Sequence, residues 1–290
     1  MNITNELKTR IVSELSERRN NFAGSDAKFA VSIGINNAQY SRIKNGDHDR
    51  VLSDSNWVSL ARRLEIPIGN APAWNIARTP VYEFITDQLN FCQANASSRL
   101  LCDIADIGKT FSAKSYVKAN KNAIYVDCSQ VKSKSKLVRF IAKEFGVGHT
   151  GWYSDVYADL VFYLRSLPSP LVILDEAGDL EYDAFLELKA LWNATERCCG
   201  WYMMGADGLR EKIRRSIECK KVGYTEIFSR YGSRYQKASP DGSEELRRFK
   251  TVHAALIIKA NTNQDVNVQQ LVARTDYSLR RIQDELRKIN

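Results

Sequence analysis

The centre of the chain contains the stretch Leu171-Val172-Ile173-Leu174-Asp175-Glu176, an apolar run that ends in two adjacent carboxylates. Such a run is typical of a buried strand in a parallel sheet, which would carry both carboxylates to its carboxyl end. Upstream, residues 103–110 read Asp-Ile-Ala-Asp-Ile-Gly-Lys-Thr, the spacing of a phosphate-binding loop with Asp103 in place of its first glycine. Together the two stretches predict a site for ATP and Mg²⁺ at one edge of a sheet.

The residue types in these stretches have separate chemical roles. Gly108 would turn backbone N–H groups toward phosphate at a helix start, Lys109 would reach the β and γ phosphates, and Thr110 would offer its hydroxyl to Mg²⁺. Asp175 would orient the Mg²⁺ shell, and Glu176 would polarise the attacking water. The expected nucleotide contacts are Asp106, Ile107, Gly108, Lys109, Thr110, Phe111 and Asp175.

Short apolar segments alternate with amphipathic helices from residue 80 onward. This alternation predicts an α/β fold, in which helices flank a mostly parallel sheet. Strands are expected at 99–103, 123–128, 171–174 and 200–204. Helices are expected at 81–94, 109–120, 134–145, 154–167 and 182–195, and residues 208–290 are expected to be mainly helical.

The N-terminal segment has a different, all-helical pattern. Helices are expected at 4–19, 26–33, 37–44 and 53–64, with Gly34 between the second and third. The order Phe29-Ala30, Gly34-Ile35, Tyr40-Ser41-Arg42-Ile43 and Gly46 resembles the λ-repressor-like helix-turn-helix family. Asn37, Gln39 and Arg42 would then face DNA, although a bundle that docks a protein would show the same periodicity.

Composition narrows the class of partner. The chain has 290 residues, 42 Lys and Arg against 34 Asp and Glu, and a net charge of +8. This balance favours a polyanionic partner, and a solvated basic face is the alternative. No apolar run approaches the roughly 20 residues of a membrane span, and no signal peptide is evident, so we expect a cytoplasmic protein without a membrane partner. The six Cys residues lack metal-site spacing and are expected to be reduced thiols.

On these motifs the chain resembles the AAA+ ATPases, and within them the transposition regulators of the phage Mu B, TnsC and IstB type. The resemblance implies an arginine finger at Arg230 or Arg234 that completes the site of a neighbouring subunit, and therefore a homo-oligomer. It also implies that Ser278-Leu279-Arg280-Arg281 is a sensor 2 motif, with Arg280 at the nucleotide. The expected domains are a helix-turn-helix domain at 1–70, an AAA+ core at 71–240 and a C-terminal helical lid at 241–290.

The same resemblance implies a role in DNA transposition. Members of this group bind double-stranded DNA without sequence preference, as ATP-dependent helical filaments or rings, and recruit or activate a transposase. The corresponding lysines here would be Lys132, Lys134 and Lys136, which alternate with serines after the second strand. Lys114 and Lys118 on the P-loop helix are further candidates. An ordinary polar loop is the alternative reading of the first three lysines.

Two positions depart from the family pattern. The Asp103 carboxylate must either point away from the phosphates or weaken their binding. Ala206 stands where a polar sensor 1 residue is expected, so either Asp207 takes that role or hydrolysis is slow. We expect a DNA-stimulated ATPase with slow turnover.

Two other functions share most of these features. A replication initiator or helicase loader would have the same ATP site and a DNA surface. A nucleotide-responsive transcription regulator would use the N-terminal helices to read an operator. Nanomolar, sequence-specific binding would favour the regulator, and filaments on arbitrary duplex would favour the transposition role.

Overall fold

The computed structural model describes residues 3–22, 24–64, 66, 68, 74–264 and 266–289. Its centre is a five-stranded sheet in the order β2-β3-β4-β1-β5, and every strand pair is parallel. The strands are β1 (Ser98–Cys102), β2 (Ala123–Asp127), β3 (Leu171–Asp175), β4 (Gly200–Gly205) and β5 (Tyr235–Gln236). The predicted α/β class is confirmed. The short β5, which pairs with Leu100 and Leu101 of β1, was not expected from the sequence.

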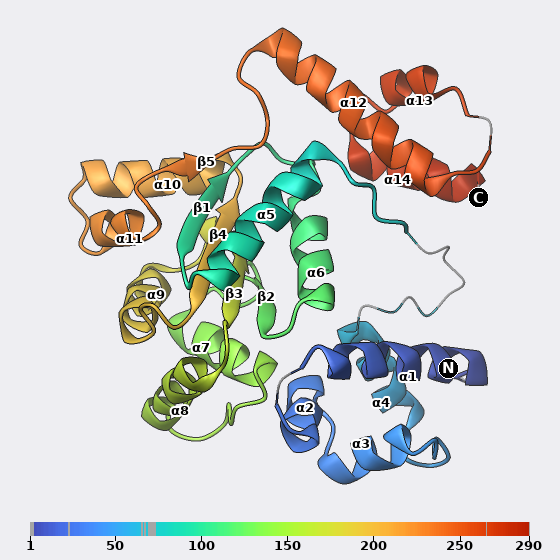
Figure 1. Cartoon of the computed structure of the whole chain (residues 1–290), viewed down its shortest axis with the longest axis vertical. Coiled ribbons are helices and arrows are strands. Elements are labelled where there is room, and N and C mark those ends of the chain that lie inside the picture. Colours follow the sequence, from blue (N-terminus) through green and yellow to red (C-terminus); the bar gives the residue numbers. More distant parts are fainter. Residues whose placement is uncertain are drawn as a thin grey trace.

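Helices cover both faces of this sheet (Figure 1). Along β3, Val172 and Leu174 join one buried cluster, whereas Leu171 and Ile173 join the cluster on the other face. This alternation follows from the two-residue period of a strand, and it explains why the whole strand is apolar. The core helices are α5 (Pro80–Ala94), α6 (Lys109–Ala119), α7 (Lys134–Glu144), α8 (Tyr153–Ser166), α9 (Tyr182–Ala194), α10 (Asp207–Glu218) and α11 (Tyr224–Arg230).

The N-terminal helices form a bundle with a hydrophobic cluster of its own. They are α1 (Asn5–Asn20), α2 (Asp26–Ile33), α3 (Asn37–Lys44) and α4 (Asp54–Arg63). Gly34 ends α2 in the left-handed conformation, with φ of 73°, which glycine adopts at little cost. Asn36 and Gln39 then form a reciprocal capping box at the start of α3. These devices fix the turn between the two short helices.

The C-terminal helices also have a separate cluster. They are α12 (Ser243–Asn261), α13 (Val268–Arg274) and α14 (Leu279–Ile289), and they lie at the opposite end of the molecule from α3 (Figure 1). Trp74, which precedes α5, packs against this cluster, and the Asn75 backbone N–H donates to Asn261 Oδ1 at 2.7 Å. Among the described residues, no helix combines the length and the hydrophobicity that a membrane span requires.

Candidate nucleotide site and DNA-facing surface

The P-loop connects β1 to α6 and has the backbone that phosphate binding requires. Gly108 caps α6 in the left-handed conformation with φ of 87°, and Asp106 has φ of 59°. Lys109 Nζ donates to the backbone oxygens of Asp103 at 3.0 Å and Ile104 at 2.6 Å. Burial lowers the pKa of this lysine, and nearby carboxylates oppose the shift. The two hydrogen bonds hold the Lys109 ammonium group inside the loop. Phosphate oxygens could replace the two backbone carbonyls there.

The Asp103 carboxylate points away from the mouth of the P-loop. The side chain is fully buried, and it accepts hydrogen bonds from the backbone N–H groups of Ile104 (2.8 Å), Ala238 (2.7 Å) and Ser239 (2.9 Å), and from the Ser239 hydroxyl. These donors offset the cost of burying the charge. Asp103 thus anchors the P-loop to the segment that follows β5. Its carboxylate points away from the phosphate site, as one of the two alternatives for this residue required.

The two stretches predicted to bind Mg²⁺ meet in the structure. Thr110 Oγ1 donates to Asp175 Oδ2 at 2.6 Å, and the Glu176 backbone N–H donates to Asp175 Oδ1 at 2.9 Å. Asp175 is only 1% exposed. A hydroxyl and a carboxylate are hard oxygen donors of the kind that Mg²⁺ prefers, so these residues fit the ion. The Tyr125 hydroxyl also donates to Asp175 Oδ2 at 2.9 Å, a contact that the sequence analysis missed.

Glu176 lies at the turn from β3 into a short 3₁₀ helix, Ala177–Asp179. Its backbone is left-handed, with φ of 49°, a conformation that is uncommon for a residue with a side chain. Burial, with Asp175 as a further cause, raises the pKa of its carboxyl group. A raised pKa brings a carboxylate closer to the range in which it can accept a proton from water.

The P-loop opens onto a cleft of about 1030 Å³. The predicted contacts Asp106, Ile107, Gly108, Phe111 and Arg280 all line it. Residues from α1, from the segment before α5, and from α12 and α14 complete its walls. A cleft of this size at a helix N-terminus can hold a nucleoside triphosphate.

The predicted sensor 2 segment lies against the P-loop. Ser278 Oγ donates to Asp106 Oδ2 at 2.8 Å, and Arg280 Nε lies 3.9 Å from Asp106 Oδ1. Arg280 is 86% exposed, so its guanidinium can change partner toward a phosphate. The contact of Ser278 could not be predicted from the local sequence, because its partner Asp106 is 172 residues away.

His253 on α12 is a second residue that the sequence analysis missed. It lines the cleft, is 4% exposed, and stacks on Phe249 with ring centroids 5.7 Å apart. Neither ring nitrogen makes a hydrogen bond of good geometry among the described residues, although the Ile107 backbone lies close to the ring. Burial lowers the pKa of this imidazole, which favours its neutral form. A neutral imidazole offers one donor and one acceptor to a ligand in the cleft.

The arginine-finger candidates do not join this chain's own site. Arg230 Nε donates to Asn193 Oδ1 at 2.8 Å, and its guanidinium lies 5.2 Å from the Trp192 ring centroid. Trp192 in turn donates to Ser98 Oγ, at the amino-terminal end of β1. The P-loop begins at the other end of that strand. Arg234 is exposed just before β5.

The segment after β4 contains Asp207, the residue predicted to replace sensor 1, and it contacts the end of β1 through Arg210. Asp207 begins α10 and is exposed, with its Oδ1 atom 3.7 Å from Arg210 Nη1. Arg210 Nη2 donates to the backbone oxygen of Cys102, the residue directly before Asp103. The substitute sensor proposed for Asp207 stays a prediction.

Two of the three lysines predicted to bind DNA after β2 have acidic neighbours. Lys132 Nζ lies 3.4 Å from Asp179, and Lys134 Nζ lies 3.1 Å from Glu187. Lys136 is exposed on the first turn of α7. A phosphate backbone would have to compete with two carboxylates to recruit all three lysines.

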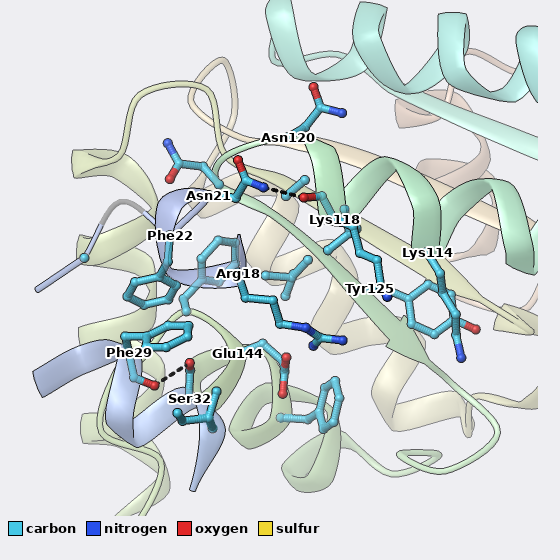
Figure 2. A pocket seen from close by; sticks show the side chains of 18 of the residues that line it. Arg18, Asn21, Phe22, Phe29, Ser32, Lys114, Lys118, Asn120, Tyr125 and Glu144 are labelled. Carbon is cyan, nitrogen blue, oxygen red and sulfur yellow. Dashed lines mark hydrogen bonds between the residues drawn. The ribbon is translucent and has the colours of Figure 1, made fainter. Parts of the chain in front are cut away.

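Lys114 and Lys118 of α6 line a cavity between the N-terminal bundle and the core (Figure 2). Lys118 Nζ lies 3.2 Å from Glu14 on α1, and the Lys118 backbone oxygen accepts a hydrogen bond from the Asn21 side chain. Lys114 Nζ lies 5.1 Å from the Tyr125 ring centroid. The cavity has a volume of about 410 Å³, and an ion pair of 2.9 Å joins Arg63 to Glu144 across it. Lys118 is therefore partly covered by the bundle.

Of the three α3 residues predicted to contact DNA, Gln39 and Arg42 already have partners within the N-terminal bundle. Asn37 is exposed. The Gln39 side chain is used in the capping box and also donates to the Val51 backbone oxygen at 3.4 Å. Arg42 is exposed, but it pairs with Asp47 at 2.7 Å and donates to the Asp49 backbone oxygen at 3.1 Å. Base recognition by this helix stays a prediction.

The central region of the chain matches a known protein family. Residues 95–213 match the protein-family model described as an AAA domain. With the parallel sheet, the P-loop and the Asp175–Glu176 pair, this match confirms the AAA+ P-loop NTPase fold that was expected for the central region. The helix-turn-helix family of the N-terminal bundle stays a prediction.

The chain is also similar to individual proteins. It is 23% identical over 227 residues to the Mu-like prophage FluMu DNA transposition protein B of Haemophilus influenzae, a match that covers 76% of this chain and 77% of that protein. A structure of the Aeropyrum pernix Orc1 protein in complex with DNA matches with a TM-score of 0.53 and 20% identity. That match covers 74% of this chain and 61% of the Orc1 chain, and it shows a shared fold.

Proposed function

We propose that this protein is an ATPase that assembles on double-stranded DNA in its ATP-bound state and recruits or activates a transposase. The contact between Thr110 and Asp175 carries the ATPase part, because it joins the predicted metal-binding groups of two distant motifs. The similarity to a DNA transposition protein supports the DNA-related part.

The chemistry divides among residues already described. Mg²⁺, when bound, neutralises charge on the β and γ phosphates. Lys109 contacts the phosphates, Thr110 and Asp175 hold the ion, and Glu176 orients and polarises the attacking water. The reaction adds water to the γ phosphorus and releases ADP and phosphate.

The remaining positive charge comes from a neighbouring subunit. Arg230 lies away from this chain's P-loop, with Arg234 the second candidate, and this location supports a homo-oligomer in which one subunit completes the site of the next. Because the finger acts in trans, hydrolysis depends on assembly, which makes the ATP-bound assembly a switch.

Electron microscopy with arbitrary duplex DNA tests the proposal. We expect helical filaments or rings in ATP and none in ADP. Lys109→Ala should abolish them, whereas Glu176→Gln should bind ATP and keep the assembly intact. Assemblies of the Lys109 variant without nucleotide would contradict the coupling. Discrete binding at one sequence would instead indicate an operator-binding regulator.

A further inference from the structure

Within the described part of the chain, three donors surround the carboxylate of Asp175. Oδ1 accepts from the Glu176 backbone N–H at 2.9 Å. Oδ2 accepts from Thr110 Oγ1 at 2.6 Å and from the Tyr125 hydroxyl at 2.9 Å. Two of these donors belong to the motifs that define the site. Tyr125 belongs to neither motif, and it reaches Asp175 from the adjacent strand β2.

The register of the sheet explains how Tyr125 comes to this position. In the parallel pair β2 and β3, Asp127 lies opposite Asp175 and Tyr125 lies opposite Ile173. The tyrosine therefore starts two residues before the carboxyl end of its strand, and the length of its side chain brings the hydroxyl to the edge where Asp175 lies. A shorter hydroxyl side chain at this position would not span the same distance.

The Tyr125 ring borders a different cavity from the cleft at the P-loop. It is half-buried, lines the cavity between the bundle and the core, and has Lys114 Nζ 5.1 Å from its centroid (Figure 2). Phenylalanine at this position would keep the ring and remove the hydroxyl together with its hydrogen bond to Asp175. Phenylalanine fills nearly the same volume.

We propose that Tyr125 is a positioning residue for Mg²⁺, which acts by holding the Asp175 carboxylate. This inference rests on the proposed nucleotide site. When the Thr110 hydroxyl turns toward the ion, Tyr125 still donates to Oδ2 of Asp175. The Glu176 backbone N–H donates to Oδ1 of the same carboxylate. A hydrogen bond to an ionised, nearly fully buried carboxylate is stronger than one between neutral groups, so its loss frees the carboxylate to rotate.

The test compares ATP binding with and without Mg²⁺ in the full-length chain. The dissociation constant of a fluorescent ATP analogue is measured in EDTA and in Mg²⁺, and their ratio gives the enhancement by the ion. Tyr125→Phe should reduce this enhancement about 10-fold, the effect of one charge-assisted hydrogen bond, and should leave the value in EDTA unchanged.

Tyr116→Phe is the matched control. Tyr116 is buried on the P-loop helix, and its hydroxyl lies 2.6 Å from Gln93 Oε1 and 3.0 Å from Asn90 Oδ1, so it donates to one of these side chains and not to Asp175. This variant loses a tyrosine hydroxyl from the same helix–sheet face and should keep the wild-type enhancement. An equal loss in both variants would show a general structural effect and would overturn the assignment.

A double-mutant cycle with Asp175→Asn gives the second measurement. If Tyr125 acts through Asp175, Tyr125→Phe should have no further effect on the enhancement in the Asp175→Asn background. Wild-type enhancement in Tyr125→Phe, or additive effects in the cycle, would overturn the proposal. Loss of enhancement in a chain that forms no DNA assembly would support the positioning role and contradict the proposed transposition function. A wild-type chain without any Mg²⁺ enhancement would overturn both.

Discussion

Asp103 and Ser239 tie the first residue of the P-loop to the segment that leads into the C-terminal helices. The Asp103 carboxylate accepts from both the Ser239 backbone N–H, at 2.9 Å, and the Ser239 hydroxyl. The pair connects the end of β1 with the chain that follows β5, and it fixes where α12 departs from the core. The aspartate that breaks the P-loop pattern is thus part of the framework around the nucleotide cleft.

Replacing Asp103 by glycine, which restores the usual pattern, should destabilise the protein. Asp103→Gly leaves the Ala238 and Ser239 N–H groups without their acceptor, and we expect a loss of about 2 kcal/mol or more in the free energy of unfolding. Urea denaturation followed by circular dichroism measures it. Asp241→Asn is the control, because Asp241 lies in the same segment with its side chain 96% exposed. An Asp103→Gly variant as stable as the control would show that the anchor contributes nothing.

The pH dependence of hydrolysis should reflect Glu176. Because its pKa is raised by burial, Glu176 stays protonated to a higher pH than an ordinary glutamate, whose pKa is 4.5. A protonated Glu176 cannot accept a proton from water, so activity should fall as pH decreases through this raised pKa. The profile of kcat/KM against pH measures the acidic limb. A limb at or below pH 4.5 would contradict the role of Glu176 as the base.

Alanine at Lys132, Lys134 and Lys136 together should weaken DNA binding and flatten its salt dependence. Each lost phosphate contact reduces the slope of log affinity against log salt by about 0.9 on duplex DNA. Fluorescence anisotropy at several salt concentrations measures the slope. A triple alanine variant at Lys220, Lys221 and Lys250 removes the same charge elsewhere. An identical slope in the wild type and the first variant would exclude this loop from the DNA surface.

Removing Glu14 should strengthen DNA binding at low salt. Glu14 pairs with Lys118 at 3.2 Å and thereby competes with phosphate for that lysine. The Lys118 side chain is 49% exposed and that of Glu14 is 18% exposed. An ion pair near the surface contributes up to about 1 kcal/mol, so Glu14→Ala should raise the affinity about 2- to 5-fold. Glu6→Ala, in the first turn of the same helix, controls for the loss of one negative charge. If both variants gain equally, Lys118 is not a DNA contact.

Several features of the site were predictable because they are local in the sequence. The strand β3 ends at Asp175, and α6 begins at Lys109, each within a residue of the expected limits. An apolar run and a Gly-Lys-Thr turn depend on neighbouring residues, so their structure follows from short-range pattern. Strand β5 has only two residues and no period to detect, which is why it was missed.

The sequence by itself determined four of the five strands, the helices α1 to α9 and the identity of the nucleotide-binding motifs, because each is set by residues a few positions apart. Only the tertiary structure decided that Asp103 points toward Ser239, 136 residues away, and that the Tyr125 hydroxyl reaches Asp175 from a neighbouring strand. It also placed Arg230 near the start of β1, away from the P-loop. Such contacts depend on strand order and on the packing of distant segments, and a local pattern contains no information about either.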